Sequence, residues 1–483
     1  MSITSTGSSL TPSSYPNQGL IVMGTGPESG INYTSILNAL DQALSAPITM
    51  MQAQETPLNN QLSAWQSIGS DVSALSSAAS ALGQPSLYQS YTAGSSNTSV
   101  ASAQTSSSAI PGTYYLSVTT LAAQDVVASQ GVAATSTAVG TGTFSITVNG
   151  KQTNINITSS NDTLAGLAQA INNSSSAAGV TASIINNGGT TNPYQLVLTS
   201  NNTGTNYTIS TTDSLTGGTA LTFSTTQAAK NAAISFEGIN IASQSNTVNS
   251  VIPGVTLSLA SGGSTTITVG LDTQTIDNAA SSFISAYNKV IGDVSNQNTV
   301  TTSGSGNNKS ASIGPLGGNV SLNNLVNNLN GFIGSEAPGI SGNAGLASTF
   351  GITQNSNGSG NLELNTATLN NMLVSNPQEV QQYFSSLVNG SPTADGVSMS
   401  GGMTYFLNTY TNPANGVIQF SEQDINDQLT AMNNQISLQQ ALVQDQMGMY
   451  TKQFSTLESY IGQMQTTNSS MSNSIKQMIS SGA

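Results

Sequence analysis

The sequence predicts a multidomain α+β protein in which the N- and C-terminal helices pair as a coiled-coil leg, with a helical body and β-rich head domains inserted between them. Three observations support this fold class. Residues 421–483 and residues 31–82 both carry apolar residues every three or four positions, and much of the chain between them alternates apolar and polar residues with a period of two. If the two ends pair as helices, everything between them forms a looped-out body.

The C-terminal segment, residues 421–483, is predicted to form a coiled-coil helix. A repeat of about 3.5 residues per turn indicates a helix that needs a partner along its length. The acids that follow Ser421 fit an S-x-x-D helix start better than a cation site. The polar positions Gln439 and Asn468 either set the register of the seam or are tolerated within it. The apolar seam positions are Ile425, Leu429, Met432, Ile436, Val443, Met447, Tyr450, Phe454, Leu457, Ile461 and Met464, continuing to Met471, Ile475 and Met478.

The N-terminal segment is the expected partner of this helix. Residues 1–45 are predicted to contain a flexible N-terminus and the start of the terminal helix, and residues 46–84 the N-terminal part of the helical body. Leu37, Leu40 and Leu44 are the predicted leg positions. Thr56-Pro57 fits an N-cap followed by the first helical residue, so two or three helices or one kinked rod are expected. Trp65 lies in phase with Leu62, Ile68 and Val72 and is assigned to the core.

The pattern in the middle of the chain predicts β structure followed by further helices. Residues 85–125 and 228–270 are predicted to be two parts of one β domain, because each offers short alternating strands that lack a nearby partner. Residues 126–227 are predicted to be an inserted α+β head module. Within it, Asn149-Gly150 between two alternating runs predicts a type I′ hairpin. Residues 271–420 are predicted to be the C-terminal part of the helical body.

The composition excludes several classes of function. Only 5% of residues are charged, the net charge is −14, and the chain has no arginine, histidine or cysteine. Zinc and thiol sites and a Ser-His-Asp triad therefore cannot be built, and nucleic-acid binding is not expected. No membrane span, no metal, no cofactor and no secretory signal are predicted. Few carboxylates also mean that little stability is lost in acid, which favours an acidic exterior; a bias of surface proteins toward small polar residues is the alternative.

Several segments resemble, in the right order, those of the flagellar filament cap protein family, also called hook-associated protein 2. Phe236–Leu259 carries the most recognisable of these motifs, and Phe144–Thr205 resembles a small module that recurs in flagellin and its relatives. The family motif positions are Gly238, Ser245, Asn246, Gly254, Val255, Thr256 and Leu257. Further resemblance lies in Gly112–Gln124, Phe283–Ile291, Phe350–Thr353 with Gly360–Leu364 and Val380–Phe384, and Tyr450–Met464. At Ser243, Asn319, Asn365 and Ala367, neutral residues replace the charged ones that the family commonly has.

The resemblance implies a structural assembly factor and not an enzyme. Such a protein would form a ring-shaped homo-oligomer, expected to have five or six subunits, at the extracellular tip of the bacterial flagellar filament. It would promote the folding and insertion of exported flagellin and prevent its loss. Its other implied partners are the hook–filament junction proteins, the flagellar type III export apparatus and a cytoplasmic export chaperone, and it would be exported without a cleaved signal peptide.

Alternatives remain open at this point. The C-terminal seam could serve only for packing against residues 31–82, or it could be shared with flagellin. The chain could be another axial flagellar protein, either a junction protein or flagellin itself, or a surface adhesin with a β head. Carbohydrate binding by residues 126–227, and with it a role in cell adhesion, is a weaker hypothesis.

Overall fold

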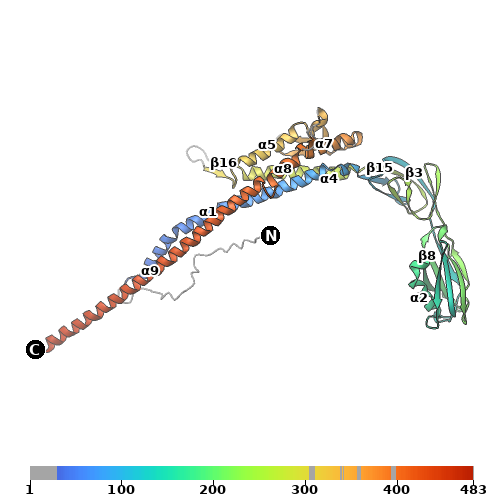
Figure 1. The fold of residues 1–483 in the computed structure, drawn as a ribbon, viewed down its shortest axis with the longest axis horizontal. Helices are drawn as coiled ribbons and strands as arrows, with labels where there is room; N and C mark the ends of the chain where they lie inside the picture. Colours follow the sequence, from blue (N-terminus) through green and yellow to red (C-terminus); the bar gives the residue numbers. More distant parts are fainter. Residues whose placement is uncertain are drawn as a thin grey trace.

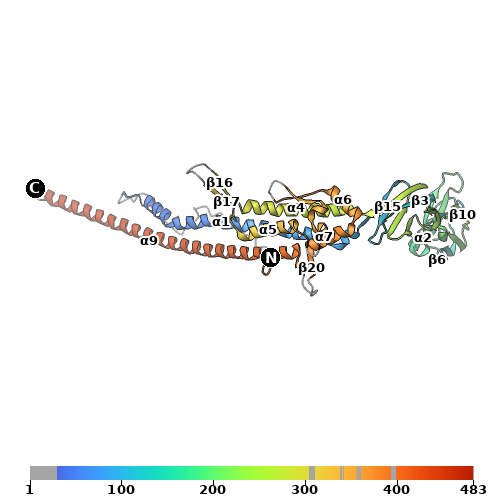
Figure 2. The same cartoon turned by 90° about the horizontal axis from the view of Figure 1, so that it is seen from above.

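The computed structural model describes residues 30–303, 310–337, 340, 342–355, 360–392 and 399–481. Figure 1 shows a long two-helix rod that thickens into a helical body, followed by two β-rich units that turn away from the rod axis. Figure 2 shows the same order from a perpendicular direction, with the C-terminus at the free end of the rod and the β-rich units at the opposite end. The predicted fold class is confirmed. The flexible segment predicted at the N-terminus lies, over residues 1–29, outside the described residues.

Two helices form the rod, here called the leg. They are α1 (Tyr33–Leu82) and α9 (Val417–Ser481). At about 1.5 Å per residue, the 65 residues of α9 extend on the order of 100 Å. The helices run in opposite directions, since Tyr33 at the start of α1 contacts Phe454 far along α9.

Both predicted helix starts in the leg are corrected by the structure. Pro47 and Pro57 lie inside one continuous α1, so Thr56 is not an N-cap and there are not two or three separate helices. A proline inside a helix costs about 3 kcal/mol, which packing against a partner can offset; Ile48, beside Pro47, is buried in such a contact. Ser421 does not begin α9: the helix starts four residues earlier, and the Ser421 hydroxyl donates to the carbonyl of Val417 within it.

The helical body packs the second half of α1 and the first turns of α9 against further helices. Trp65 is buried here, as predicted. The core is lined by residues such as Phe283, Leu325, Phe384 and Leu407, which come from four different helices. The body contains α4 (Thr273–Gln297), α5 (Val320–Gly334), α6 (Thr366–Ser375), α7 (Pro377–Asn389) and α8 (Met403–Thr411), with the hairpins β16 (Val300–Ser303)/β17 (Ser310–Ile313), β18 (Ile352–Gln354)/β19 (Leu362–Leu364) and β20 (Gly390–Pro392)/β21 (Met399–Gly401). Short 3-10 turns are η1 (Pro85–Gln89), η3 (Asn343–Gly345) and η4 (Ala347–Phe350).

The β domain next to the body is a sandwich of two antiparallel sheets. One has the order β1-β15-β3-β11-β12 and the other β13-β14-β2. Both sheets combine strands from before and after the inserted module, for example through the pairs Tyr114–Ile267 and Leu257–Ala103. The strands are β1 (Tyr91–Ser95), β2 (Ala101–Thr105), β3 (Gly112–Thr120), β11 (Ala232–Phe236), β12 (Ile239–Ser243), β13 (Thr247–Ile252), β14 (Val255–Leu259) and β15 (Gly263–Leu271).

The head module follows β3 and ends before β11. Its sheets have the orders β10-β4-β8-β7 and β6-β5-β9, and they enclose a separate core with α2. Asn149 and Gly150 both have positive φ, 53° and 72°, so the predicted type I′ hairpin is confirmed. The elements are β4 (Gln124–Ser129), β5 (Thr141–Val148), β6 (Lys151–Ile157), α2 (Leu164–Asn173), α3 (Ser175–Ala178), β7 (Val180–Asn186), β8 (Tyr194–Thr203), η2 (Thr205–Tyr207), β9 (Ser210–Thr216) and β10 (Phe223–Gln227).

Candidate interaction surface along the leg

The seam of α9 begins inside the body and continues along the leg. Ile425 and Leu429 belong to the core of the body. Farther along, Ile436 and Val443 pack with Ile48 of α1 in a small buried cluster. These contacts account for the proximal half of the seam as packing within the chain. Leu44, Met51, Met432 and Met447 are half-buried against this cluster.

The described pairing of α1 with α9 ends at a polar contact. Tyr33 is fully buried, its ring lies 5.1 Å from that of Phe454, and its hydroxyl donates to the Glu458 carboxylate at 2.7 Å. Glu458 is 7% exposed, whereas its neighbour Leu457 is 44% exposed. The seam that faces α1 therefore takes a step of four from Phe454 to Glu458. Leu37 is buried, and Leu40, Tyr450 and Ile461 are half-buried.

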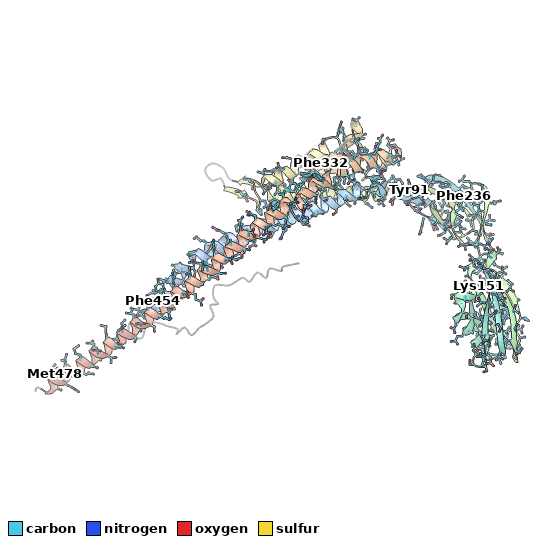
Figure 3. The ribbon with its side chains drawn as sticks, viewed as in Figure 1. Tyr91, Lys151, Phe236, Phe332, Phe454 and Met478 are labelled. Atoms are coloured by element: carbon cyan, nitrogen blue, oxygen red, sulfur yellow. The ribbon has the colours of Figure 1, made fainter. Side chains whose placement is uncertain are left out.

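Beyond this contact the apolar repeat of α9 is exposed. Met464, Met471 and Ile475 have exposed fractions of 71%, 56% and 47%, and Leu457 belongs to the same repeat. We call these four residues the distal seam. Their spacing of seven and four residues places them along one stripe of the helix. Figure 3 shows this part of α9, between Phe454 and Met478, extending past the end of α1.

The motif residues lie in the β domain, away from the leg, and Asn246 lies where the head module joins it. The Asn246 side chain pairs with Ala122 in both directions, since Oδ1 accepts from its N–H at 2.7 Å and Nδ2 donates to its carbonyl at 3.0 Å. Gly254 forms the turn between β13 and β14 with φ 72°. Val255 and Leu257 are buried in the core of the β domain, whereas Thr256 is only partly buried. Gly238 forms a hairpin turn with φ 81°, and the Ser245 hydroxyl accepts from Thr247 N–H at 3.0 Å. This geometry assigns the motif to the structure of the β domain, and through Asn246 to its junction with the head module.

A buried carboxylate at the same junction is not evident from the sequence pattern. Asp125 is 1% exposed, and its two oxygens accept from the backbone N–H groups of Ile209 at 2.7 Å and Ala229 at 3.1 Å. Its own N–H donates to the Ser200 hydroxyl. Because two backbone donors satisfy the carboxylate, it holds the two ends of the inserted module together.

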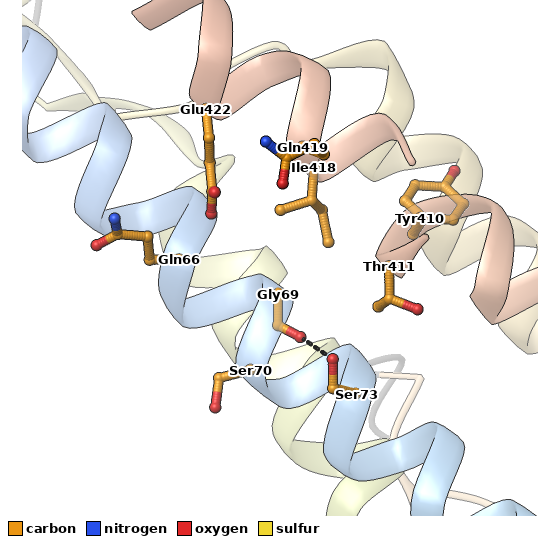
Figure 4. A pocket seen from close by; sticks show the side chains of 9 residues that line it. All are labelled: Gln66, Gly69, Ser70, Ser73, Tyr410, Thr411, Ile418, Gln419 and Glu422. Carbon is orange, nitrogen blue, oxygen red and sulfur yellow. Dashed lines mark hydrogen bonds between the residues drawn. The ribbon is translucent and has the colours of Figure 1, made fainter. Parts of the chain in front are cut away.

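A polar groove lies where α1, α8 and α9 meet, with a volume of about 240 Å³. Figure 4 shows the Glu422 carboxylate beside Gln66, and the Ser73 hydroxyl donating to the Gly69 carbonyl at 2.8 Å. Partial burial raises the pKa of the Glu422 carboxyl. Asp424 and Asp427, which lie farther along α9, accept hydrogen bonds from Gln428 and Gln423 of their own helix. The described residues contain no cluster of three or more metal-ligating acids, so this region does not form a candidate metal site.

The described helices include none that is long and apolar enough to cross a membrane. The candidate interaction site considered below is the distal seam of the leg, whose large apolar side chains are exposed.

Comparison with known proteins identifies relatives along most of the chain. Residues 29–125 match the model of the flagellar hook-associated protein 2 N-terminus, residues 229–466 match that of its C-terminus, and residues 143–202 match the flagellin hook IN motif. The B-type flagellar hook-associated protein 2 of Pseudomonas aeruginosa is 27% identical over 377 residues, which cover 73% of this chain and 78% of that protein. The flagellar hook-associated protein 2 of Escherichia coli K12 is 32% identical over 160 residues, covering 32% of this chain and 34% of that protein.

A solved structure is similar over three quarters of the chain. The D1-D2-D3 domains of the flagellar cap protein FliD from Escherichia coli superpose with a TM-score of 0.53 at 26% sequence identity. The match covers 75% of this chain and 99% of that structure.

Proposed function

Because the chain belongs to the flagellar hook-associated protein 2 family, a family of flagellar cap proteins, we propose that it caps the tip of the bacterial flagellar filament as a ring of five or six copies. In this role the ring promotes the folding and insertion of exported flagellin at the growing end and prevents its loss to the medium. The protein then acts outside the cell, after export by the flagellar type III apparatus with a cytoplasmic chaperone, and it is added after the hook–filament junction proteins. No step of this role requires bond-making chemistry by the chain.

The observation that carries the proposal is the distal seam. In the proximal leg, buried apolar residues such as Val443 pack against α1. Past Glu458, the same repeat continues through Met464, Met471 and Ile475 with large exposed side chains. An apolar stripe with coiled-coil spacing gains stability when a second helix covers it. We assign that role to helices of flagellin at the growing end of the filament.

The low charge of the leg agrees with such a contact. Between residues 457 and 481 the only charged side chains are those of Glu458 and Lys476. With few charges to attract or repel, apolar packing and neutral hydrogen bonds would carry the contact, and it would depend only weakly on salt. Such a contact also suits the repeated binding and release that insertion of successive subunits requires.

The first experiment separates a cap from another axial protein. The purified full chain is imaged by electron microscopy and its mass is measured by analytical ultracentrifugation. A cap forms closed rings with a fixed number of subunits. Open filaments, or monomers at every concentration tested, would contradict the proposal and favour a flagellin or junction protein.

The second experiment tests the distal seam directly. In a strain that lacks the gene, the wild-type chain is compared with the triple variant Met464→Gln, Met471→Gln and Ile475→Gln, which keeps good helix formers but removes the apolar stripe. The matched control replaces Ser470 and Ser474 by alanine in the same turns of α9. We expect the triple variant to be exported and to form rings, but to release most flagellin into the medium. Normal filaments in the triple variant would contradict a role of this stripe.

A further inference from the structure

One charged cluster lies between two helices of the body, in a chain that has few charges. Lys289 and Asp293 lie on α4, and Asp71 and Ser67 face them from α1. Within the described residues, both ion pairs formed by side chains involve Lys289. The cluster therefore sits at the contact that joins the leg helix α1 to the rest of the body.

The geometry places two carboxylates around one ammonium group. The Lys289 Nζ donates to Asp71 Oδ1, and it lies 3.4 Å from Asp293 Oδ2. The Ser67 hydroxyl donates to the same oxygen of Asp293 at 3.2 Å. The Asp71 side chain is only 7% exposed, and its second oxygen, Oδ2, is buried without a hydrogen-bond partner among the described residues. A buried carboxylate oxygen without a donor is costly, and one ammonium cannot neutralise two carboxylates.

We propose that Asp71 and Asp293 share one proton beside Lys289, and that this proton is taken up in mildly acidic surroundings and strengthens the contact between α1 and α4. The proton comes from solvent and binds Asp71 on Oδ2. Asp71 then donates a hydrogen bond to the Asp293 carboxylate, which stays ionised and paired with Lys289. The net charge of the cluster changes from −1 to zero, and Oδ2 of Asp71, once protonated, donates a hydrogen bond. This inference does not depend on the proposed capping role.

The pKa directions agree with this geometry. Burial, followed by the interaction with the neighbouring Asp293 carboxyl, raises the pKa of the Asp71 carboxyl above its usual range. The same interaction is the main cause that lowers the pKa of Asp293, with Lys289 and Ser67 adding to it. Lys289 and Asp293 are the charged groups that act on Asp71. Because the pKa of Asp71 is higher in the folded chain than in the unfolded chain, the folded state gains stability as the pH falls through that raised pKa. The pairing of Asp293 is lost only when the pH falls below its own lowered pKa.

The test uses the single tryptophan of the chain as a local reporter. Trp65 is 3% exposed in the core of the body and lies on α1 near Asp71, so its fluorescence follows unfolding of this part of the molecule. Urea unfolding of the full chain is measured from about pH 7 to about pH 4 for the wild type and for Asp71→Asn, which mimics the protonated form at every pH. The matched control is Asp427→Asn, an exposed carboxylate on α9.

The quantity compared is the folding equilibrium constant of Asp71→Asn divided by that of the wild type. We expect this ratio to fall as the pH is lowered, because only the wild type gains stability from protonation of Asp71. The fall is about tenfold for each unit by which the pKa of Asp71 in the folded chain exceeds its value in the unfolded chain. The ratio for Asp427→Asn should change little over the same range. A ratio for Asp71→Asn that stays constant or rises in acid would overturn the proposal.

A second measurement uses only the wild-type chain, so its result does not depend on whether a variant folds. Infrared spectra of the wild-type chain labelled with carbon-13 at the aspartate carboxyl groups detect protonated aspartate directly. We expect one protonated carboxyl band to persist at pH values above the ordinary pKa of aspartate, about 3.9. If all aspartate bands titrate at or below that value, no proton is shared and the proposal fails.

Discussion

Replacing Ile436 by alanine is expected to open the leg locally without unfolding the body. Ile436 is 7% exposed and packs with Ile48 and Val443 in a cluster that is separate from the core of the body. A buried isoleucine replaced by alanine costs about 2–5 kcal/mol, depending on how far the neighbours relax into the space. Here the surrounding side chains include three half-buried methionines, which are flexible and can fill part of the cavity. The low end of the range, about 2 kcal/mol, therefore applies.

Hydrogen–deuterium exchange measures this change where it occurs. Since about 1.4 kcal/mol corresponds to a factor of ten, protection of the α1 amides near Ile48 should fall about 30-fold, whereas amides near Trp65 should be unaffected. The matched control is Leu438→Ala, two residues along the same helix, where the side chain is 65% exposed. Equal loss of protection in the two variants would refute the assignment of the proximal seam to packing against α1.

Two further predictions concern the β domain and its junction with the head module. Asn246→Ala removes both hydrogen bonds to Ala122, at a cost of about 1–3 kcal/mol, and should speed limited proteolysis at the junction, whereas Asn240→Ala, at an exposed position, should not. Gly254→Ala should lower the melting temperature of the β domain more than Gly238→Ala does. Both glycines have positive φ, a conformation that costs about 1–2 kcal/mol for a residue with a side chain. At Gly254 an added β-carbon would also lie 2.4 Å from the backbone nitrogen of Ala109. At Gly238 the space around an added β-carbon is open. Equal melting temperatures for the two glycine variants would contradict this account.

Local signals in the sequence predicted the elements that depend on local chemistry. A type I′ turn requires positive φ at two successive residues, and asparagine and glycine adopt positive φ more readily than other residues do. Asn149 and Gly150 both have it. The apolar repeat of the leg likewise follows from the geometry of one helix, so Ile436 and Val443 could be placed before any partner was known.

Features that depend on contacts between distant residues could not be predicted in this way. Glu458 lies in the seam because Tyr33, 425 residues away, donates to it, and a pattern of apolar residues does not register a buried carboxylate. Thr56-Pro57 was interpreted as a helix start, because a local pattern does not show that α1 continues through Pro47 and Pro57; beside Pro47, Ile48 packs against Ile436 and Val443 of α9. The strands β1 and β2 contain mainly small and polar residues, so their alternation is weak, and they form through pairing with β15 and β14.

The roles of the candidate residues could be predicted only in part from the sequence. The distal seam was predicted as a continuation of the leg repeat, but the sequence could not show that α1 begins beside Glu458 and leaves Met464 and Met471 exposed. The motif around Asn246 was selected by resemblance alone, and its role in joining two domains needs the position of Ala122.

The most direct test of the proposed capping role is deletion of the gene, followed by measurement of unpolymerised flagellin in the culture medium. The account predicts cells with hooks but without filaments, and flagellin released as monomer, with both defects reversed by the wild-type chain. Normal filaments on the deletion strain would contradict the capping role and leave the leg without its proposed partner.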